Sequence, residues 1–152
     1  MLPMNSSLPT PKACPGEGRA EPAPAVEGLG ARRFTILYAE QAPLVADAVR
    51  ETLEAEGWSV EVCARGDEAL RRLQEGGRFD LLILDFGLPG LDGLELARRA
   101  RALPRAFRTP IIMFTDSEVE CDARRAGVDA YLRKPRGVYR LAHTAAGLLA
   151  RG

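Results

Sequence analysis

The sequence predicts an α/β fold in which five parallel strands lie in the order 2-1-3-4-5 with helices on both faces of the sheet. Two observations predict this class. Short apolar or alternating segments recur five times, and each is followed by a segment with apolar residues three or four positions apart, as on a helix. The connections are short, which specifies right-handed crossovers between parallel strands. The first, third and fourth strand segments are the most continuously apolar, so we place them centrally.

The expected strands are short, and most end at a polar residue or a turn. Trp58, Val60 and Val62 alternate in the second strand with the period of two that a strand requires. The third strand runs to Leu84 and stops at Asp85, before a loop rich in glycine and proline. The strand segments cover residues 34–39, 58–63, 81–84, 109–115 and 129–132.

Each expected helix carries a start or a stop signal. Pro43 suits a first helical turn, glycines follow several of the helical segments, and Pro104 closes the third. Ser117 is expected to cap the fourth helix with its side chain. The helix segments run from Pro43 to Gly57, from Gly66 to Gly76, from Gly93 to Leu103, from Ser117 to Ala126 and from Val138 to Ala150.

Residues 1–32 differ from the rest of the chain. They contain six prolines among Gly, Ser, Ala and Glu, with no helical or strand period. Such a segment buries too little apolar surface to offset its ordering entropy. We therefore expect a flexible tail over residues 1–32 and one folded domain over residues 33–152.

Composition narrows the classes of function. The 152 residues suit one domain, and 21 basic side chains balance 21 acidic ones, so no strong field predicts direct contact with nucleic acid or anionic lipid. The three cysteines are widely spaced and show no disulfide or metal pattern. With no apolar run long enough to span a bilayer and no signal peptide, we expect a cytoplasmic location without membrane contact.

Polar residues follow the strands at one edge of the predicted sheet. Glu40 and Gln41 come after the first strand, Asp85 after the third, Thr115 at the end of the fourth and Lys134 after the fifth. Clustered carboxylates repel one another unless a cation joins them, and Mg²⁺ prefers such oxygen ligands. This edge could accept a phosphoryl group, with Asp85 as nucleophile, Lys134 neutralising phosphoryl oxygens and Thr115 donating a hydrogen bond.

At this point the folded part, from about Arg33 to Arg151, resembles the receiver domain of two-component response regulators, a flavodoxin-like fold. ILYAEQAPL is similar to the family's first strand and acidic pair, and FDLLILDFGLPGLDGLEL to its phospho-acceptor strand and loop. IIMFT ends at the family's hydroxyl position, and VDAYLRKP carries its switch aromatic, lysine and proline.

The resemblance implies a role for each matching residue. Asp85 would be the phospho-acceptor, Thr115 and Tyr131 the switch pair, and Lys134 the lysine that, with Thr115, assists phosphoryl transfer. The Lys134-Pro135 peptide bond would be cis. The implied Mg²⁺ ligands are Glu40, Gln41, Asp85 and the backbone carbonyl of Gly87.

The chain departs from the family pattern at several positions. The family has a second acid where this chain has Gln41, so one charge is lost; a charge pair at about 4 Å is worth roughly 4 kcal/mol at an effective dielectric of 20, before desolvation. We expect reduced Mg²⁺ affinity and slow or absent phosphorylation. Asp116 would repel a phosphoryl group or replace the missing ligand. The fourth helix is expected to be short, and Arg136 stands where an apolar residue is usual.

Two functions remain open. The first is a single-domain response regulator that takes a phosphoryl group on Asp85 from a sensor histidine kinase or phosphotransfer protein and signals through a downstream protein or a homodimer contact. The second is a pseudo-receiver, a protein-interaction module that needs no phosphorylation. Gln41 and Asp116 favour the second. The intact site residues favour the first, namely Asp85, Thr115, Tyr131 and Lys134. Both are signalling roles rather than enzymes.

Three other readings lack a feature that they need. A phosphatase of the haloacid dehalogenase type would carry a second acid where Gly87 stands. A nucleotide-binding protein would carry a glycine fingerprint after the first strand. His143 is expected to be solvated on the last helix, off the apolar stripe, so a phosphotransfer histidine is not expected there.

Overall fold

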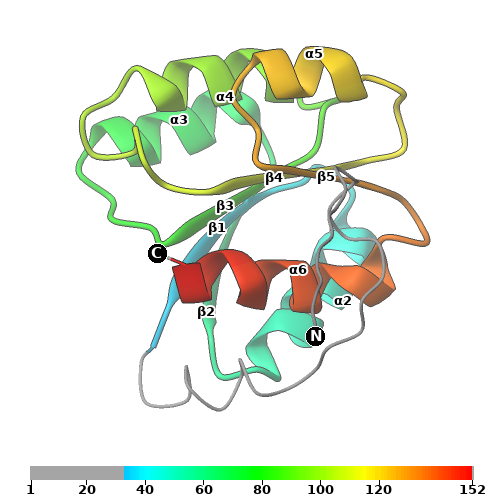
Figure 1. Ribbon diagram of the computed structural model, residues 1–152. Coiled ribbons are helices and arrows are strands. Elements are labelled where there is room, and N and C mark those ends of the chain that lie inside the picture. The colour runs from blue at the N-terminus through cyan, green and yellow to red at the C-terminus, as the bar shows by residue number, and fades with distance from the viewer. Residues whose placement is uncertain (1–32, 152) are drawn as a thin grey trace, which may run out of the picture.

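The computed structural model describes residues 33–151, and its five parallel strands lie in the order β2-β1-β3-β4-β5, which confirms the predicted fold class. The predicted tail, residues 1–32, lies outside the described residues. Figure 1 shows the strands as a single twisted sheet. The strands are β1 (Thr35–Ala39), β2 (Ser59–Cys63), β3 (Leu81–Leu84), β4 (Ile111–Thr115) and β5 (Ala130–Arg133).

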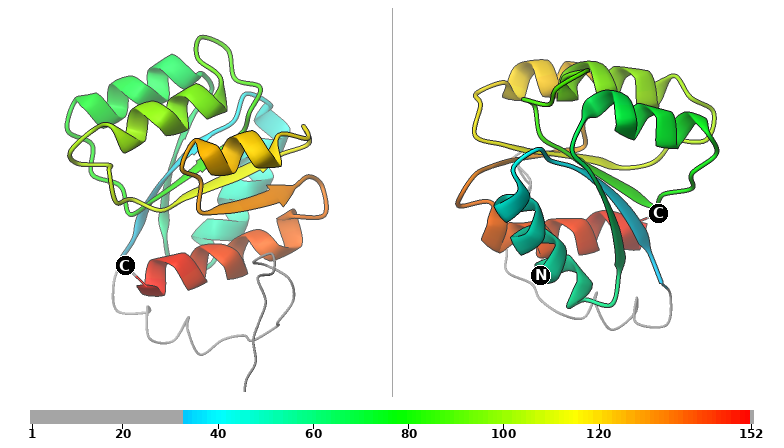
Figure 2. Two further views of the ribbon diagram at one scale, coloured as in Figure 1. Left: turned by 45° about the horizontal axis from the view of Figure 1, so that its top comes forward. Right: turned by 180° about the vertical axis from the view of Figure 1, so that it is seen from behind.

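Helices cover both faces of the sheet. Figures 1 and 2 show α2 and α6 on one face, and α3, α4 and α5 on the other. None of the helices within residues 33–151 is both long and apolar enough to cross a membrane. The helices are α2 (Pro43–Glu54), α3 (Gly66–Gln74), α4 (Gly93–Arg101), α5 (Glu120–Arg125) and α6 (Val138–Arg151).

The sheet separates two hydrophobic cores. Successive residues of a strand point to opposite faces, so Ile83 packs with α2 and α6 whereas Leu82 and Leu84 pack with α3, α4 and α5. All residues of β3 and β4 are buried, as expected for central strands covered on both faces. This double covering explains why these segments read as continuous apolar runs.

The predicted helix signals hold for most helices. Pro43 is the first residue of α2, and α3 begins at Gly66. Gly57, Gly76 and Gly127 follow α2, α3 and α5 with φ values of 92°, 95° and 100°. A positive φ is strained for other residues, so glycine ends each of these helices at low cost.

Two helix predictions were wrong. The third helix, α4, ends at Arg101 rather than Leu103, because the chain turns ahead of Pro104. Ser117 does not cap the fourth helix: α5 begins at Glu120, and its N-cap residue Val119 makes no side-chain capping hydrogen bond. The short α5 confirms the expected shortening. The remaining helix and strand boundaries agree with the predictions or differ from them by at most three residues.

The strand order sets where a site can form. β1 and β3 are neighbours although β2 lies between them in sequence, so the crossovers from β1 and β3 leave on opposite faces of the sheet. Ligands of open α/β sheets bind at such a point, outside the carboxyl ends of the strands. Ala39 pairs with Leu84, so the residues that follow them, Glu40 and Asp85, leave the sheet side by side.

Candidate functional site

Two carboxylates form the centre of the site at the carboxyl ends of β1 and β3. The Asp85 N–H donates to the Ala39 carbonyl at 3.1 Å, and the Glu40 N–H donates to the Cys63 carbonyl at 2.9 Å, so the sheet ladder continues to both residues. Glu40 is 2% exposed and Asp85 8% exposed. Burial of two neighbouring acids requires positive charge or hydrogen-bond donors around them.

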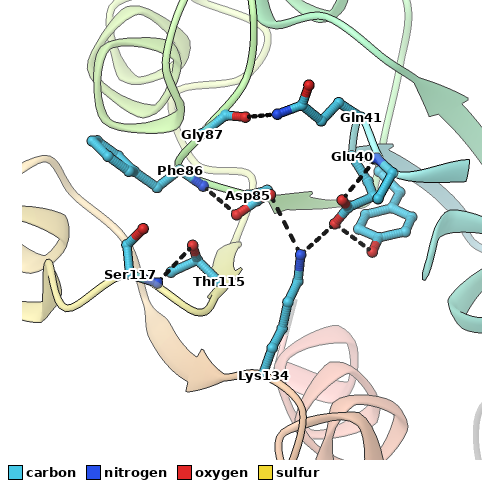
Figure 3. Close-up of polar contacts among 10 residues, drawn as sticks. Glu40, Gln41, Asp85, Phe86, Gly87, Thr115, Ser117 and Lys134 are labelled. Atoms are coloured by element: carbon cyan, nitrogen blue, oxygen red, sulfur yellow. Dashed lines mark hydrogen bonds and ion pairs between the residues drawn. The ribbon is translucent and has the colours of Figure 1, made fainter.

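Lys134 supplies the positive charge. Its Nζ lies 2.6 Å from Glu40 Oε1 and 3.4 Å from Asp85 Oδ2. Figure 3 shows its side chain reaching between the two acids from the segment after β5. The Lys134-Pro135 bond is cis, as the resemblance implied. Lys134 therefore joins the two acids, and its shorter contact is with Glu40.

Tyr38 completes the surroundings of Glu40. Its hydroxyl donates to Glu40 Oε1 at 3.2 Å, and the Ala42 N–H donates to Oε2 at 3.0 Å. Burial, and then the nearby charge of Glu40, raise the pKa of Tyr38. The sequence analysis missed this contact. The signal was present, because residues two apart on a strand share a face, which places Tyr38 beside Glu40.

Gln41 bonds to the loop after β3. Its side-chain Nε2 donates to the backbone carbonyl of Gly87 at 2.6 Å (Figure 3). Asp85 Oδ1 accepts the N–H of Phe86 at 2.8 Å, so its carboxylate also turns toward this loop. The two predicted ligands Gln41 and Gly87 are thus brought together, and their contact is a hydrogen bond between them.

Thr115 and Tyr131 lie around the loop that leads into α5. Thr115 is fully buried, and its Oγ1 accepts the Ser117 N–H at 3.3 Å. The Tyr131 hydroxyl donates to the Ser117 carbonyl and accepts the Val119 N–H, the latter at 3.1 Å. Ser117 therefore uses its backbone to hold Tyr131. The predicted switch pair meets at one loop.

A divalent cation such as Mg²⁺ would need several oxygen ligands at this site. Residues 33–151 hold no group of three or more His, Cys, Asp or Glu side chains that could bind a metal ion, and Asp116 is exposed. The idea that Asp116 replaces the missing ligand is therefore not supported. The expected ligand oxygens of Glu40, Asp85 and Gly87 already accept protein donors. A Mg²⁺ ion at this site would therefore share these oxygens with the present donors or displace them.

The arrangement still suits chemistry with an anion. A carboxylate, Asp85, lies beside an ammonium group, Lys134, and the buried hydroxyl of Thr115 lies at the same edge of the sheet (Figure 3). The Thr115 oxygen accepts one hydrogen bond and keeps its proton for donation. Such donors stabilise negative charge that develops on a group carried by the carboxylate.

The fold and this edge define a class, the open α/β proteins with an acidic site at the point where the strand order reverses. The sequence model of the response regulator receiver domain matches residues 36–146. The chain belongs to this family. Receiver domains are signalling modules of two-component systems, and as a family they bind Mg²⁺ and interact with histidine kinases or phosphotransfer proteins.

Curated relatives are mostly regulators longer than this chain. The phosphate regulon transcriptional regulatory protein PhoB of Rhizobium meliloti is 46% identical over 103 residues, which are 66% of this chain and 45% of PhoB. The gliding motility regulatory protein of Myxococcus xanthus is 34% identical over 78% of this chain and 15% of its own length. The chain thus spans less than half the length of these relatives.

Solved structures support the same family. A CheY-like receiver domain protein from Methanospirillum hungatei is 30% identical, covers 78% of this chain and 94% of its own, and has a TM-score of 0.71. The receiver domain of the sensor histidine kinase PA1611 from Pseudomonas aeruginosa is 29% identical, with a TM-score of 0.70 over 76% of this chain and 97% of its own. That structure has magnesium coordinated in its active-site cleft.

Proposed function

We propose that this domain accepts a phosphoryl group on Asp85 from the phosphohistidine of a sensor histidine kinase or phosphotransfer protein. The observation that carries the proposal is the reach of Lys134, whose Nζ lies 3.4 Å from Asp85 Oδ2 at the carboxyl end of β3. An ammonium at this distance can neutralise an oxygen of a phosphoryl group carried by the carboxylate.

The proposed transfer uses only groups of the chain and of the donor. A carboxylate oxygen of Asp85 attacks phosphorus, the phosphorus–nitrogen bond of the phosphohistidine breaks, and its electron pair stays on the imidazole nitrogen. The products are an acyl phosphate on Asp85 and a free histidine. When the other ring nitrogen of the phosphohistidine carries a proton, the imidazole leaves neutral and no further proton is needed. Lys134 and the Thr115 hydroxyl then bind phosphoryl oxygens.

The proposed output passes through the loop between β4 and α5. Thr115 Oγ1 accepts the Ser117 N–H, and the Tyr131 hydroxyl holds both ends of residues 117–119. A phosphoryl group that draws the Thr115 hydroxyl toward Asp85 would weaken the bond to Ser117 and shift the Tyr131 contacts. The face formed by α5, β5 and α6 would then change its affinity for a protein partner or a second copy of the chain.

We also propose that Mg²⁺ binds this site weakly. Glu40, Asp85, the Gly87 carbonyl and Gln41 are the expected ligands, but Gln41 contributes no charge where the family has an acid. The missing charge weakens the free energy of Mg²⁺ binding by up to the energy of one charge pair. That energy is about 4 kcal/mol at 4 Å and an effective dielectric of 20, less the desolvation that a carboxylate at position 41 would have undergone.

A second function has one specific observation in its favour. The Gln41–Gly87 hydrogen bond ties the loop after β3 to the segment after β1 through a side chain of the domain itself. A domain that is ordered in this way could serve as a pseudo-receiver, recognised through the same face whether or not Asp85 is modified. The two functions differ in whether Asp85 is chemically required.

Incubation of the purified protein with a small-molecule phosphodonor, followed by intact mass measurement, tests the proposal. We expect one added phosphoryl group, in millimolar Mg²⁺ and more slowly in chelator. Asp85→Asn should take up none, whereas Asp116→Asn, which changes an exposed neighbour of Thr115, should still be labelled.

Failure of labelling in wild-type protein under both conditions would contradict the switch and favour the pseudo-receiver. Equal labelling of Asp85→Asn would show that a different residue reacts. Faster labelling of Gln41→Asp in Mg²⁺ would support the weak cation site, because that variant restores the charge which the family has at this position.

A further inference from the structure

We propose that the side-chain amide of Gln41 takes the place of a divalent cation in holding the Gly87 carbonyl. The Nε2–O distance of 2.6 Å makes this a short, direct bond between the segment after β1 and the loop after β3. Gln41 then does more than remove a charge, because its amide supplies a hydrogen bond where a metal ion would otherwise bridge the two segments.

The orientation of the amide follows from chemistry. A carbonyl oxygen only accepts hydrogen bonds, and a glutamine side chain carries one accepting oxygen and one donating nitrogen. If the Gln41 oxygen faced the Gly87 oxygen at 2.6 Å, two lone pairs would repel. The nitrogen must therefore face Gly87. In this orientation the carbonyl is engaged by a donor and the amide oxygen points away from it, as Figure 3 shows.

The charges of the site favour the same conclusion. Glu40 and Asp85 carry two negative charges, and Lys134 contacts both of them. One net negative charge remains, where an acid at position 41 would leave two. Because repulsion between neighbouring carboxylates is what a divalent cation relieves, the present site has less need of one.

The rest of the loop is fixed from its other side. The Gly66 N–H donates to the Pro89 carbonyl at 2.9 Å, and the Leu88 and Gly93 N–H groups donate to the Phe86 carbonyl at 2.9 and 2.8 Å. These bonds tie the loop to α3 and to the start of α4. The Gly87 carbonyl is the part that faces the site, and Gln41 is the residue that ties it there.

Gln41 can weaken Mg²⁺ binding in two ways, through its missing charge or through its hydrogen bond to Gly87, and a substitution separates them. If only the missing charge matters, Gln41→Ala should leave the loop as it is and bind Mg²⁺ no better than wild type. If the amide takes the cation's place, Gln41→Ala should free the Gly87 carbonyl, loosen the loop and make it responsive to Mg²⁺. The Ala variant adds no charge, so only the second mechanism predicts a response.

The test is amide hydrogen exchange of Leu88, measured by NMR in chelator and in millimolar Mg²⁺. In wild-type protein we expect the same exchange rate under both conditions. In chelator, Gln41→Ala should exchange about three- to tenfold faster, the factor expected for one lost hydrogen bond. Mg²⁺ should slow exchange in Gln41→Ala and more strongly in Gln41→Asp.

Gln74→Ala is the matched control, because it removes the same side chain from an exposed position at the far end of α3. It should exchange like wild type. The Ile83 amide in β3 serves as an internal reference for global unfolding. Unchanged Leu88 exchange in Gln41→Ala, or Mg²⁺ protection of the wild-type loop as strong as that of Gln41→Asp, would overturn the proposal. No phosphorylation is measured, so this result is independent of the proposed transfer to Asp85.

Discussion

Glu40 accepts more hydrogen bonds than any other side chain that the structure describes at the site. Its carboxylate accepts hydrogen bonds from the Tyr38 hydroxyl, the Ala42 N–H and Lys134 Nζ, and only 2% of the residue is exposed. A buried carboxylate is tolerated when all its oxygens have donors. The local stability of the site therefore depends on Lys134 more than on any other side chain.

Lys134→Met is expected to destabilise the protein by about 3 kcal/mol, because it keeps the apolar stem but leaves two buried acids without a counter-charge. Urea unfolding at neutral pH measures the change. Arg136→Met, at an exposed position two residues on, should change stability by less than about 0.5 kcal/mol. Similar stabilities of the two variants would contradict the pairing seen here.

The ion pair between Glu61 and Arg72 makes the free energy of unfolding depend on pH. A side-chain hydrogen bond from Arg72 lowers the pKa of Glu61 below 4.5. A lowered pKa contributes stability that is present above pH 4.5 and is lost as pH falls through the folded-state pKa. Glu61→Gln should therefore unfold at a lower urea concentration than wild type at neutral pH. The difference in stability should be about 0.5 kcal/mol for this partly exposed pair and should vanish in acid. A difference that persists unchanged in acid would argue against the ion pair.

At the scale of elements, Arg101 at the end of α4 joins the segment before β4 to the turn before β5. The Arg101 guanidinium donates to the carbonyls of Gly127 and Thr109 at 2.8 and 2.7 Å and pairs with Asp129 at 2.8 Å. It also donates to the carbonyls of Ala106 and Phe107. The side chain thus satisfies backbone groups of the irregular segment between α4 and β4 and of the turn before β5.

Arg101→Met is expected to cost about 2–3 kcal/mol, because several backbone carbonyls lose their donor at once. Thermal or urea unfolding provides the measurement. Arg99→Met is the matched control on the same helix, since Arg99 is exposed and its guanidinium pairs with Glu95. A cost for Arg99→Met as large as that for Arg101→Met would contradict this role.

Gly66, the first residue of α3, packs closely against the loop after β3. A Cβ built at Gly66 would lie 1.8 Å from the Leu91 carbonyl oxygen, so Gly66→Ala must displace the loop after β3 and should cost about 2–3 kcal/mol. Gly147→Ala, in the interior of α6 with nothing within 4 Å, should instead stabilise by about 0.5–1 kcal/mol. Opposite signs in urea unfolding are the expected result, and two similar losses would refute the close contact at Gly66.

The sequence predicted the features that depend on pattern and topology. Parallel strands end at one edge, so Glu40, Asp85 and Lys134 could be placed together before any side chain was seen. The Gln41–Gly87 bond could not, because it depends on the path of a loop and on one side-chain rotamer. Ser117 failed as a cap because a tertiary contact, the Tyr131 hydroxyl on its carbonyl, outweighed a local motif.

At the scale of the whole molecule, the sheet carries the site at its edge and a core on each face. The loop after β4 lies between the site and α5, which covers the same face as α3 and α4 (Figure 2). Tyr131 packs against that core and bonds to the loop. In the proposed function, a change at Asp85 would reach the surface through Thr115 and Tyr131.

The most direct test of this coupling is the amide NMR spectrum before and after reaction with a small-molecule phosphodonor, with Asp85→Asn beside wild type. We predict shifts at residues 115–119, at Tyr131 and along α5 in wild type, with small changes on the α2 side and none in Asp85→Asn. If intact mass shows a phosphoryl group on Asp85 but these amides do not move, or if Asp85→Asn shifts in the same way, the proposed switch is contradicted.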